Sequence, residues 1–354
     1  MKKNTKALIL SLALGYSTTI YSATNILESV QDTNGNQINA HAGGVIYSSG
    51  YYYWYGEYRS PKPSDSSHWD SNQKVTLYKS KDMKKWDYQG VILDLSKDPN
   101  NWDLERPKII YNKANDNFVM WFHLEPNRKY TEGFAGTAVS KTINGPFKLI
   151  SARRPNQNIN PKSNNFTDDK NWFVKQANKK FNEFLPKGQQ VRDLTAFVDD
   201  DNKAYLIYES EDDYSLQVVQ LTDDYTSFTK NYSRILIGKQ NEAPSITKYK
   251  GSYFLITSGL TGYKANPPRI YKAKSIYGPW EYLGSPLYSN GRFIPKTIYN
   301  AQPSYIFRNP KNQQVILMMD IWDISNGGFK NLWKSSYAWL PLTFSDKYSR
   351  FIIE

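Results

Sequence analysis

The chain contains the segment Gly44-Val-Ile-Tyr47, the short polar turn Ser48-Ser-Gly50 and the aromatic run Tyr51-Tyr-Tyr-Trp-Tyr55. Two β-rich runs joined by such a turn are typical of a β-hairpin. The same order of strand, polar turn and second strand recurs further along the sequence. The later units begin at Lys108-Ile-Ile-Tyr111, Leu194-Thr-Ala-Phe-Val198, Ser245-Ile-Thr-Lys-Tyr249 and Ser304-Tyr-Ile-Phe307. Helical periodicity is nearly absent, so these units predict an all-β protein.

Each hairpin unit has enough sequence after it for about two further strands, which makes about four strands per unit. In several units an aromatic residue follows a second turn, as at Trp86, Phe147 and Trp280, and we place it between the outer strands. Five such units at long, uneven spacing are typical of a five-bladed β-propeller. A β-sandwich with irregular strands is the alternative, and the constant order within the units makes it the weaker one.

The domain organisation follows from the spacing of these units. We expect residues 23–354 to form a single propeller domain, because the five units use the chain to its end. The widest gap, at about residues 151–190, is polar and rich in lysine and asparagine, and we interpret it as an insertion that loops over one face. No separate carbohydrate-binding module is expected.

The N-terminal segment has the layout of a secretory signal peptide. A basic start at residues 1–6 precedes a mostly apolar run at 7–20, and small residues follow at Ser22 and Ala23. The apolar run is short for a membrane span, and no later stretch approaches that length. We therefore predict that residues 1–22 are a signal peptide and that the mature protein is soluble, without membrane association, and secreted or periplasmic.

The composition excludes several function classes. The chain has no cysteine, which rules out a thiol nucleophile and cysteine metal sites. Its formal net charge is +12, but the lysines are scattered through turns rather than clustered as in nucleic-acid-binding proteins. The 28 Tyr, 16 Phe and 10 Trp suit β-strands and also provide stacking surfaces for sugar rings. We expect a monomer that does not bind nucleic acid.

Polar residues stand directly before the first strand of every unit. In a propeller these strands run along the central channel, so residues at their starts converge. The segments concerned are Asn39-Ala-His41, Glu105-Arg-Pro107, Arg192-Asp193, Glu242-Ala-Pro244 and Ala301-Gln-Pro303. Glu57, at the end of the second strand of the first unit, could approach the same place.

Three of these residues are carboxylates: Glu105, Asp193 and Glu242. Carboxylates confined together repel one another, so at least one should have a raised pKa and stay protonated near neutral pH. A protonated carboxyl group beside a glycosidic oxygen is what glycoside hydrolysis requires. The structural alternative is that these carboxylates pair with Arg106 and Arg192 and only hold blades together.

These motifs resemble those of glycoside hydrolase family 43. The resemblance covers nearly the whole mature chain, and it rests on Glu242-Ala-Pro244, on Arg192-Asp193 before an Asp-rich hairpin, and on the five-unit layout. A narrower resemblance to the exo-β-1,3-galactanase branch rests on the segments Asn39-Ala-His-Ala-Gly-Gly44, Tyr53-Trp-Tyr-Gly-Glu57, Glu105-Arg-Pro-Lys108 and Ala301-Gln-Pro303. It implies an inverting enzyme of carbohydrate metabolism that releases galactose units from the non-reducing end of β-1,3-galactan, the backbone of type II arabinogalactans.

The resemblance also implies roles for individual residues. Glu242 matches the general acid, and Asp193 matches the carboxylate that sets the pKa and orientation of that acid. Most of the family has an aspartate base before the first strand, whereas this chain has Asn39-Ala-His41 there. In the galactanase branch a glutamine matched by Gln302 is thought to hold the attacking water, assisted by a glutamate matched by Glu105. An amide is a very poor base, so the base stays open between Gln302 and Glu105.

The resemblance further implies that Glu57 and Tyr130 bind galactose. We add His41 to the substrate-binding candidates because of its place before the first strand. The histidines lack metal-ligand spacing, so we predict no catalytic metal and no required cofactor, with a structural Ca²⁺ in the channel as the one ion to consider. Two other functions remain open: an α-L-arabinofuranosidase or β-xylosidase of the same family, and a non-catalytic glycan-binding propeller.

Overall fold

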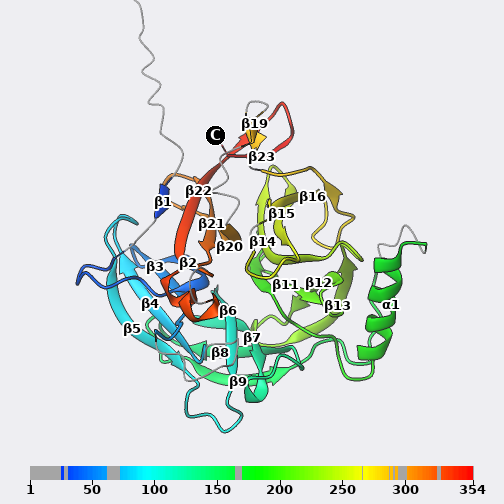
Figure 1. Ribbon diagram of the computed structural model, residues 1–354, viewed down its shortest axis with the longest axis horizontal. Helices are drawn as coiled ribbons and strands as arrows, with labels where there is room; N and C mark the ends of the chain where they lie inside the picture. Colours follow the sequence, from blue (N-terminus) through cyan, green and yellow to red (C-terminus); the bar gives the residue numbers. More distant parts are fainter. Residues whose placement is uncertain are drawn as a thin grey trace, which may run out of the picture.

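The computed structural model describes residues 25–27, 31–61, 72–163, 170–264, 266–286, 288–289, 292–293, 301–324 and 328–353. Within these ranges most strands pair into five antiparallel sheets that surround a common axis as the blades of a propeller (Figure 1). This arrangement confirms the predicted fold and excludes the β-sandwich. The predicted signal peptide lies outside the described residues.

The blades follow one another in sequence order, and each hairpin unit supplies the first two strands of its blade. Blade one contains β2 (His41–Ser48), β3 (Tyr51–Glu57), β4 (Lys74–Ser80) and β5 (Asp87–Asp94). Blade two contains β6 (Asp103–Asn112), β7 (Asn117–Glu125), β8 (Phe134–Ser140) and β9 (Lys148–Arg153). Blade three contains β10 (Leu194–Val198), β11 (Ala204–Ser210), β12 (Ser215–Leu221) and β13 (Phe228–Ile235).

Blade four contains β14 (Asn241–Tyr249), β15 (Ser252–Gly259), β16 (Arg269–Ala273) and β17 (Glu281–Tyr282). Blade five contains β20 (Ala301–Arg308), β21 (Val315–Ile321), β22 (Ser336–Ser345) and β1 (Asn25–Leu27). The strand β23 (Arg350–Ile352) also pairs with β22, and β18 (Tyr288–Ser289) forms a small hairpin with β19 (Arg292–Phe293). Because the N-terminal β1 is the outer strand of the last blade, it joins the two ends of the propeller.

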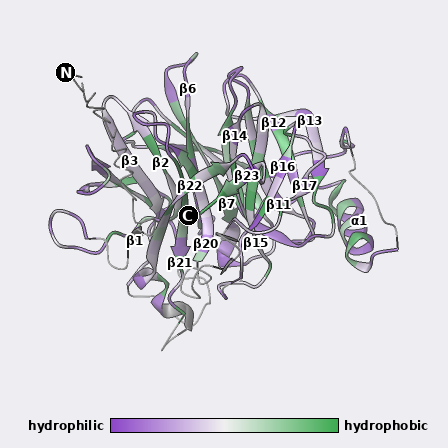
Figure 2. Ribbon diagram, turned by 90° about the horizontal axis from the view of Figure 1, so that it is seen from above, coloured by the Kyte–Doolittle hydropathy of each residue, from purple (hydrophilic) through white to green (hydrophobic). Residues whose placement is uncertain are grey.

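The hydrophobic core lies between neighbouring blades, which explains why many strands are apolar on both faces. Successive side chains of a strand point to opposite faces. In β7, Met120 packs between blades one and two, whereas Val119 and Trp121 pack between blades two and three. In Figure 2 hydrophobic segments lie within strands that also contain pale stretches, whereas the peripheral loops are mostly hydrophilic.

Aromatic residues close the ring between blade one and blade five. Trp54, Trp86 and Trp339 meet edge to face, with ring centroids 4.7–5.8 Å apart. Such pairs contribute about 0.5–1.5 kcal/mol each beyond the burial of their area. Trp86 directly precedes the outer strand β5, as predicted from its place after the second turn.

A β-bulge follows the start of the first strand in blades one, two, four and five. The bulged residues Ala42, Arg106 and Ala243 have φ angles of 47°, 52° and 56°. Bulges of this kind re-aim the neighbouring side chain and are common beside active sites. In blade one the strands are so close that a Cβ on Gly43 would lie 1.8 Å from the carbonyl oxygen of Tyr55, so only glycine fits.

The predicted insertion contains helix α1 (Trp172–Phe184), which lies outside blade three, beside β13 (Figure 1). The side chain of Asn171 caps it by accepting a hydrogen bond from the Phe173 backbone N–H at 2.8 Å. Short 3₁₀ turns occur at η1 (Pro126–Arg128) and η3 (Gly328–Lys334). Among the described residues, none of the helices has the length and apolar character that a membrane crossing requires.

Candidate active site

The polar residues at the starts of the first strands meet at one end of the channel, as predicted. The structure includes all of them within those strands except Asp193, which directly precedes β10. They occupy equivalent positions, and each pairs with a residue at the end of the second strand. The pairs are His41 with Glu57, Glu105 with His123, Asp193 with Glu209, Glu242 with Ser258, and Gln302 with Asp320. The site is therefore built from two sets of residues rather than from the first strands alone.

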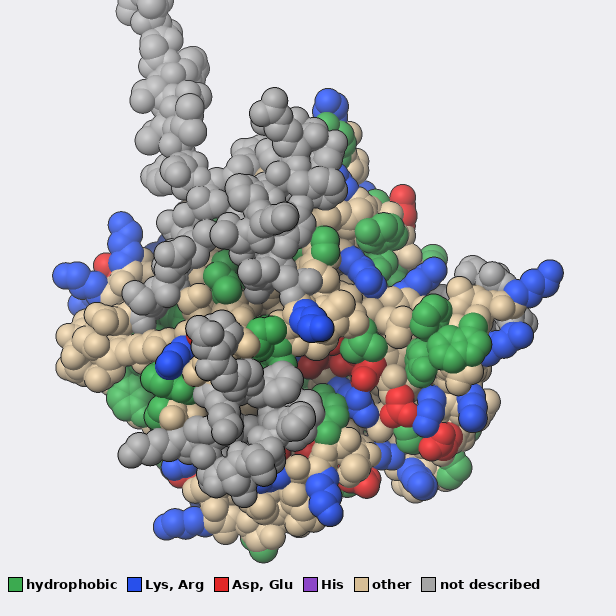
Figure 3. Space-filling view, viewed as in Figure 1, with side chains coloured by type: hydrophobic (Ala, Val, Ile, Leu, Met, Phe, Trp, Pro, Cys, Tyr) green, Lys and Arg blue, Asp and Glu red, His purple; other side chains and the backbone are tan. Residues whose placement is uncertain are grey.

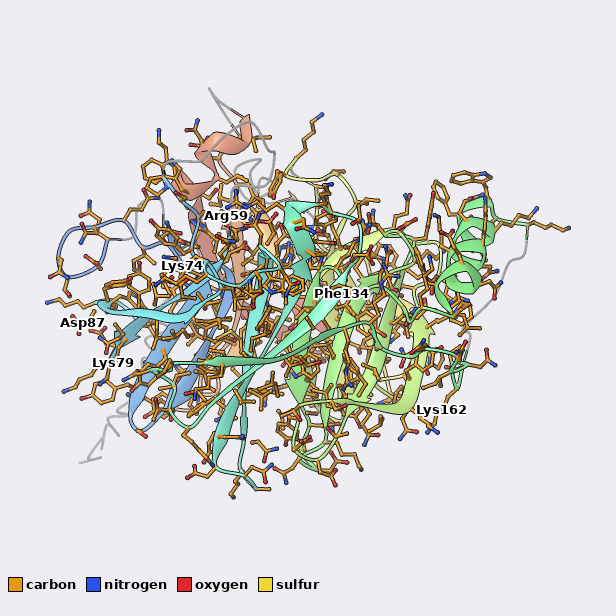
Figure 4. The ribbon with its side chains drawn as sticks, turned by 90° about the horizontal axis from the view of Figure 1, so that it is seen from below. Arg59, Lys74, Lys79, Asp87, Phe134 and Lys162 are labelled. Atoms are coloured by element: carbon orange, nitrogen blue, oxygen red, sulfur yellow. The ribbon has the colours of Figure 1, made fainter. Side chains whose placement is uncertain are left out.

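A cavity of about 180 Å³ opens at this end of the channel. Its lining includes the predicted Glu57, Glu105, Tyr130, Asp193, Glu242 and Gln302, together with Ala42, Arg59, Arg106, Asp213, Gly262, Tyr263 and Trp322. Figure 3 shows acidic side chains in a hollow near the centre of this face. Figure 4 shows the propeller from its side, with Arg59 towards the upper edge and Lys162 towards the lower edge.

Glu242 has the environment of a carboxylic acid that is protonated at neutral pH. Its side chain is buried, and burial together with the negative charges of Asp193 and Asp213 raises its pKa to about 8, although Arg106 opposes the shift. Its Oε1 atom accepts a hydrogen bond from Gln302 Nε2 at 2.8 Å. The structural alternative, in which each carboxylate forms an ion pair with an arginine, therefore does not apply to Glu242.

Asp193 takes the arginine instead. Its Oδ1 lies 2.7 Å from Arg106 Nε, and its Oδ2 accepts the backbone N–H of Ala243 at 2.9 Å. Because Ala243 directly follows Glu242, Asp193 both repels the negative charge of Glu242 and holds the backbone that carries it. The second predicted arginine, Arg192, pairs with Asp213 at 2.8 Å rather than with Asp193.

Gln302 is held in one orientation by donors that cannot act as acceptors. Its Oε1 accepts hydrogen bonds from Arg106 at 2.5 Å and from Trp322 Nε1 at 2.9 Å. Arginine and tryptophan side chains only donate, so the amide oxygen must face them. The amide nitrogen then points to Glu242, at 2.8 Å, and to Ser258 Oγ, at 3.3 Å.

Glu105 is ionised. Burial alone would raise its pKa, but the hydrogen bond and the positive charge of His123 lower it below the usual value. Glu105 Oε2 lies 3.1 Å from His123 Nδ1, and the opposite nitrogen of the ring lies 2.9 Å from Glu125 Oε1. These two carboxylates outweigh the effect of burial and raise the pKa of His123 to about 9, so the histidine is charged at neutral pH.

The remaining predicted residues differ in their access to the cavity. Glu57 lines it, bound to Arg59 at 2.9 Å, and burial raises its pKa to about 7. Tyr130 lines it with its ring beneath Arg192, at 4.7 Å. His41 is fully buried, stacks on Tyr337 at 5.3 Å and is not a lining residue. Because it is buried, His41 supports the site from behind, and the substrate contact predicted for it has no basis in its position.

Several lining residues were missed by sequence reasoning. Arg59 stands two residues after the end of β3 and lies 4.9 Å from the ring of Trp322, which follows β21. Asp213 lies in the turn between β11 and β12. These positions share one signal: the second strand of a hairpin ends where the first begins, so its final residues reach the same face. The sequence expectation for Glu57 rests on this signal, which holds for the other blades as well.

The channel behind the cavity holds a buried lysine, and burial together with the positive charge of Arg106 lowers the pKa of its amine to about 7. Lys108 is fully buried, and its Nζ lies 2.6 Å from the carbonyl oxygen of Ala42 and 3.3–3.4 Å from those of Arg106 and Pro107. Among the described residues no group of His, Asp and Glu has an arrangement that could hold a metal ion. A lysine on three carbonyl oxygens occupies a position that would otherwise suit a cation.

Comparison with known proteins places this site in a family. No protein-family model matches the chain, and the curated proteins contain no match. Among solved structures, a GH43 β-1,3-galactosidase with bound galactodeoxynojirimycin is 36% identical, with a TM-score of 0.80 over 94% of this chain and 97% of the other.

Two exo-β-1,3-galactanases are also similar. The enzyme from Clostridium thermocellum is 31% identical, with a TM-score of 0.74, over 94% of this chain and 64% of its own length. The enzyme from Phanerochaete chrysosporium, solved with β-1,3-galactotriose, is 27% identical, with a TM-score of 0.71, over 94% of this chain and 67% of its own. With the first match spanning almost the full length of both chains, this protein belongs to glycoside hydrolase family 43.

Proposed function

We propose that this glycoside hydrolase is an inverting exo-β-1,3-galactanase that removes galactose units from the non-reducing end of β-1,3-galactan. The observation that carries the proposal is the cavity in which a protonated Glu242 and an ionised Glu105 face the same small space. Two titratable groups whose environments push their pKa values apart are the usual signature of an acid and a base. The similar enzymes, named for β-1,3-galactose linkages, supply the identity of the sugar.

In this mechanism Glu242 donates its proton to the glycosidic oxygen as the bond to the leaving chain breaks. Asp193 is a positioning residue, because it holds the backbone next to Glu242 and keeps the pKa of the acid high. Glu57 and Tyr130 line the cavity and bind the galactose hydroxyl groups. Inversion then requires that water attack from the opposite face of the sugar.

We assign the base role to Glu105. The oxygen of Gln302 already accepts two hydrogen bonds, from Arg106 and Trp322, so it is poorly placed to take a proton from water. An imidic-acid tautomer would put a proton on that same oxygen, facing two N–H donors. Gln302 instead donates to Glu242 and fixes the orientation of the acid. His123 keeps Glu105 ionised and therefore able to accept the proton.

The remaining parts of the proposal concern the setting of the reaction. We propose a secreted or periplasmic monomer that has no membrane partner and needs no cofactor, with polysaccharide or oligosaccharide as substrate. Lys108 supports the absence of a required channel ion, because its Nζ already occupies the position in front of the carbonyl oxygens of Ala42, Arg106 and Pro107. If a structural Ca²⁺ is bound elsewhere in the channel, treatment with a chelator should lower the Tm of the protein.

The decisive experiment is product analysis on debranched β-1,3-galactan. We expect free galactose as the product, and NMR of the first turnovers should show the α-anomer because inversion changes the configuration of a β-linked sugar. Release of the β-anomer would overturn the inverting mechanism. Release of long oligomers would overturn the exo mode.

The alternatives predict other products. Hydrolysis of aryl α-L-arabinofuranosides or aryl β-xylosides without hydrolysis of galactan would indicate a family 43 enzyme with a different substrate. Tight galactan binding without any product after long incubation would indicate a binding propeller. The charge states of Glu242 and Glu105 favour turnover, because a site that only binds glycan has no need of an acid and a base.

A further inference from the structure

An exposed aromatic cluster lies where the insertion meets blade three. Trp172 and Phe173, the first residues of α1, are 57% and 39% exposed. Their ring centroids are 5.1 Å apart, and both lie near the ring of Tyr214, at 6.1 and 6.5 Å. Neighbouring exposed rings of this kind mark an interaction site more often than a scattered exposed residue does. We call these three residues the aromatic platform.

The residues of the aromatic platform are not the ones that attach α1 to blade three. The helix buries a different side, formed by Val174, Ala177, Phe181 and Phe184. Arg234 of β13 lies 4.4 Å from the ring of Phe181, which adds a polar contact beneath the helix. The Trp172 ring is therefore available for another partner.

The aromatic platform is joined to the wall of the cavity through one turn. Tyr214 directly follows Asp213, which lines the cavity, in the turn between β11 and β12. Lys180 of α1 binds Asp212 of the same turn at 2.7 Å, which fixes the helix to it. Figure 3 shows hydrophobic side chains over α1 on the same face as the acidic hollow.

The turn is also held from the side of the cavity. Arg192 binds Asp213 at 2.8 Å and lies 4.7 Å from the ring of Tyr130, a lining residue. Beneath the turn, Glu211 forms a buried pair with Arg234 at 2.6 Å. The aromatic platform therefore has a fixed position relative to the cavity, as a binding subsite requires.

We propose that the aromatic platform binds galactosyl units of the leaving chain, on the reducing-end side of the scissile bond. The inference rests on the proposed exo mode, in which one galactose fills the cavity and the rest of the polymer must leave across this face. Tyr and Trp rings offer an apolar face with a polar edge, which suits the alternation of C–H faces and hydroxyl groups on a sugar. Long substrates would reach the platform, and the shortest ones would not.

The test compares Trp172→Ala with wild type on β-1,3-linked galactose oligomers of increasing length. We expect unchanged kcat/KM on an aryl β-galactoside and on the disaccharide, and a loss of about three- to tenfold on polymeric galactan, mainly in KM, by analogy with the energy of aromatic pairs. Trp172→Phe should restore most of the loss because it keeps a flat ring. Tyr282→Ala is the matched control, since Tyr282 is 59% exposed on β17 of another blade.

The outcomes separate this proposal from the proposed function. Equal values of kcat/KM for wild type and Trp172→Ala at every chain length would overturn the platform while leaving the galactanase intact. An equal loss on the aryl galactoside and on the polymer would also overturn it, because the effect would then act on the catalytic centre. Failure of the wild-type protein to hydrolyse any β-1,3-galactan would instead overturn the proposed function. Unchanged Tm values show that the variants are folded.

Discussion

Replacing Glu242 with glutamine should remove the proton donor while keeping the shape of the site. The amide has nearly the size of the carboxyl group, and its oxygen can still accept the hydrogen bond from Gln302 Nε2 that Glu242 Oε1 accepts at 2.8 Å. The variant should therefore fold and bind substrate, but it cannot donate a proton to the departing oxygen.

The expected magnitude follows from the role of the group. A positioned general acid contributes roughly 10²–10⁴-fold to the rate, which corresponds to about 2.7–5.4 kcal/mol of activation free energy. We expect kcat on β-1,3-galactan to fall by that factor. An aryl galactoside with an acidic phenol needs little protonation of its leaving group, so its kcat should fall much less.

The pH dependence gives a second, independent magnitude. With a pKa of about 8, roughly nine tenths of Glu242 is protonated at pH 7 and about one tenth at pH 9. Activity of the wild-type enzyme should thus decline about tenfold per pH unit above pH 8. In Glu242→Gln this alkaline limb should disappear, because an amide does not titrate.

The assay measures kcat/KM between pH 5 and 10 on both galactan and an activated aryl galactoside. Matched far-UV spectra and Tm values for the two proteins serve as the control for folding. Normal turnover of galactan by Glu242→Gln would refute the assignment of the acid. An unchanged alkaline limb in the variant would show that another group titrates there.

Other predictions follow from the surroundings of the site. His123→Gln removes the positive charge that lowers the pKa of Glu105, so the acidic limb of kcat/KM should move to higher pH; an unmoved limb would argue against Glu105 as the base. Glu211→Gln breaks a fully buried ion pair with Arg234 and should cost about 3–5 kcal/mol in unfolding free energy, measured with urea. Gly43→Ala should lower Tm and activity together, because its Cβ would overlap a carbonyl oxygen of the neighbouring strand; wild-type values would contradict the observed approach of the strands.

The fold could be predicted because each repeating unit is formed by residues that are close together in the sequence. Each hairpin unit contains two strands and a turn within about fifteen residues. Once the units are recognised, their number specifies the propeller. The structure of the insertion was harder to predict from the sequence. Val174, Ala177, Phe181 and Phe184 have the spacing of one helix face, but they lie within a polar, lysine-rich segment. Their packing against blade three depends on partners such as Ile237 and Arg234 that are distant in sequence.

The site could be predicted only in part for a related physical reason. The starts of the first strands were found because each precedes an apolar run, a pattern visible in the chain. The pairing of Arg106 with Asp193 depends on the angle at which blades two and three meet. The pairing of Arg192 with Asp213 depends on the turn between β11 and β12, which returns to the start of β10 within blade three. The burial of His41 likewise follows from Tyr337 of blade five, which stacks against it across the closure of the ring.

The bulges of blades one and four show how residues from separate blades are fixed relative to one another. The bulged residues Ala243 and Ala42, both with positive φ, direct their backbone N–H groups to carboxylates of the neighbouring blade: Asp193 accepts from Ala243, at 2.9 Å, and Asp320 accepts from Ala42, at 3.1 Å. The residue just before each bulge, Glu242 or His41, is thereby fixed relative to the next blade and not only to its own sheet. Asp193 therefore both raises the pKa of Glu242 and holds the backbone that positions it. Loss of Asp193 should consequently disturb the pKa and the geometry of Glu242 together, in agreement with the positioning role proposed for it.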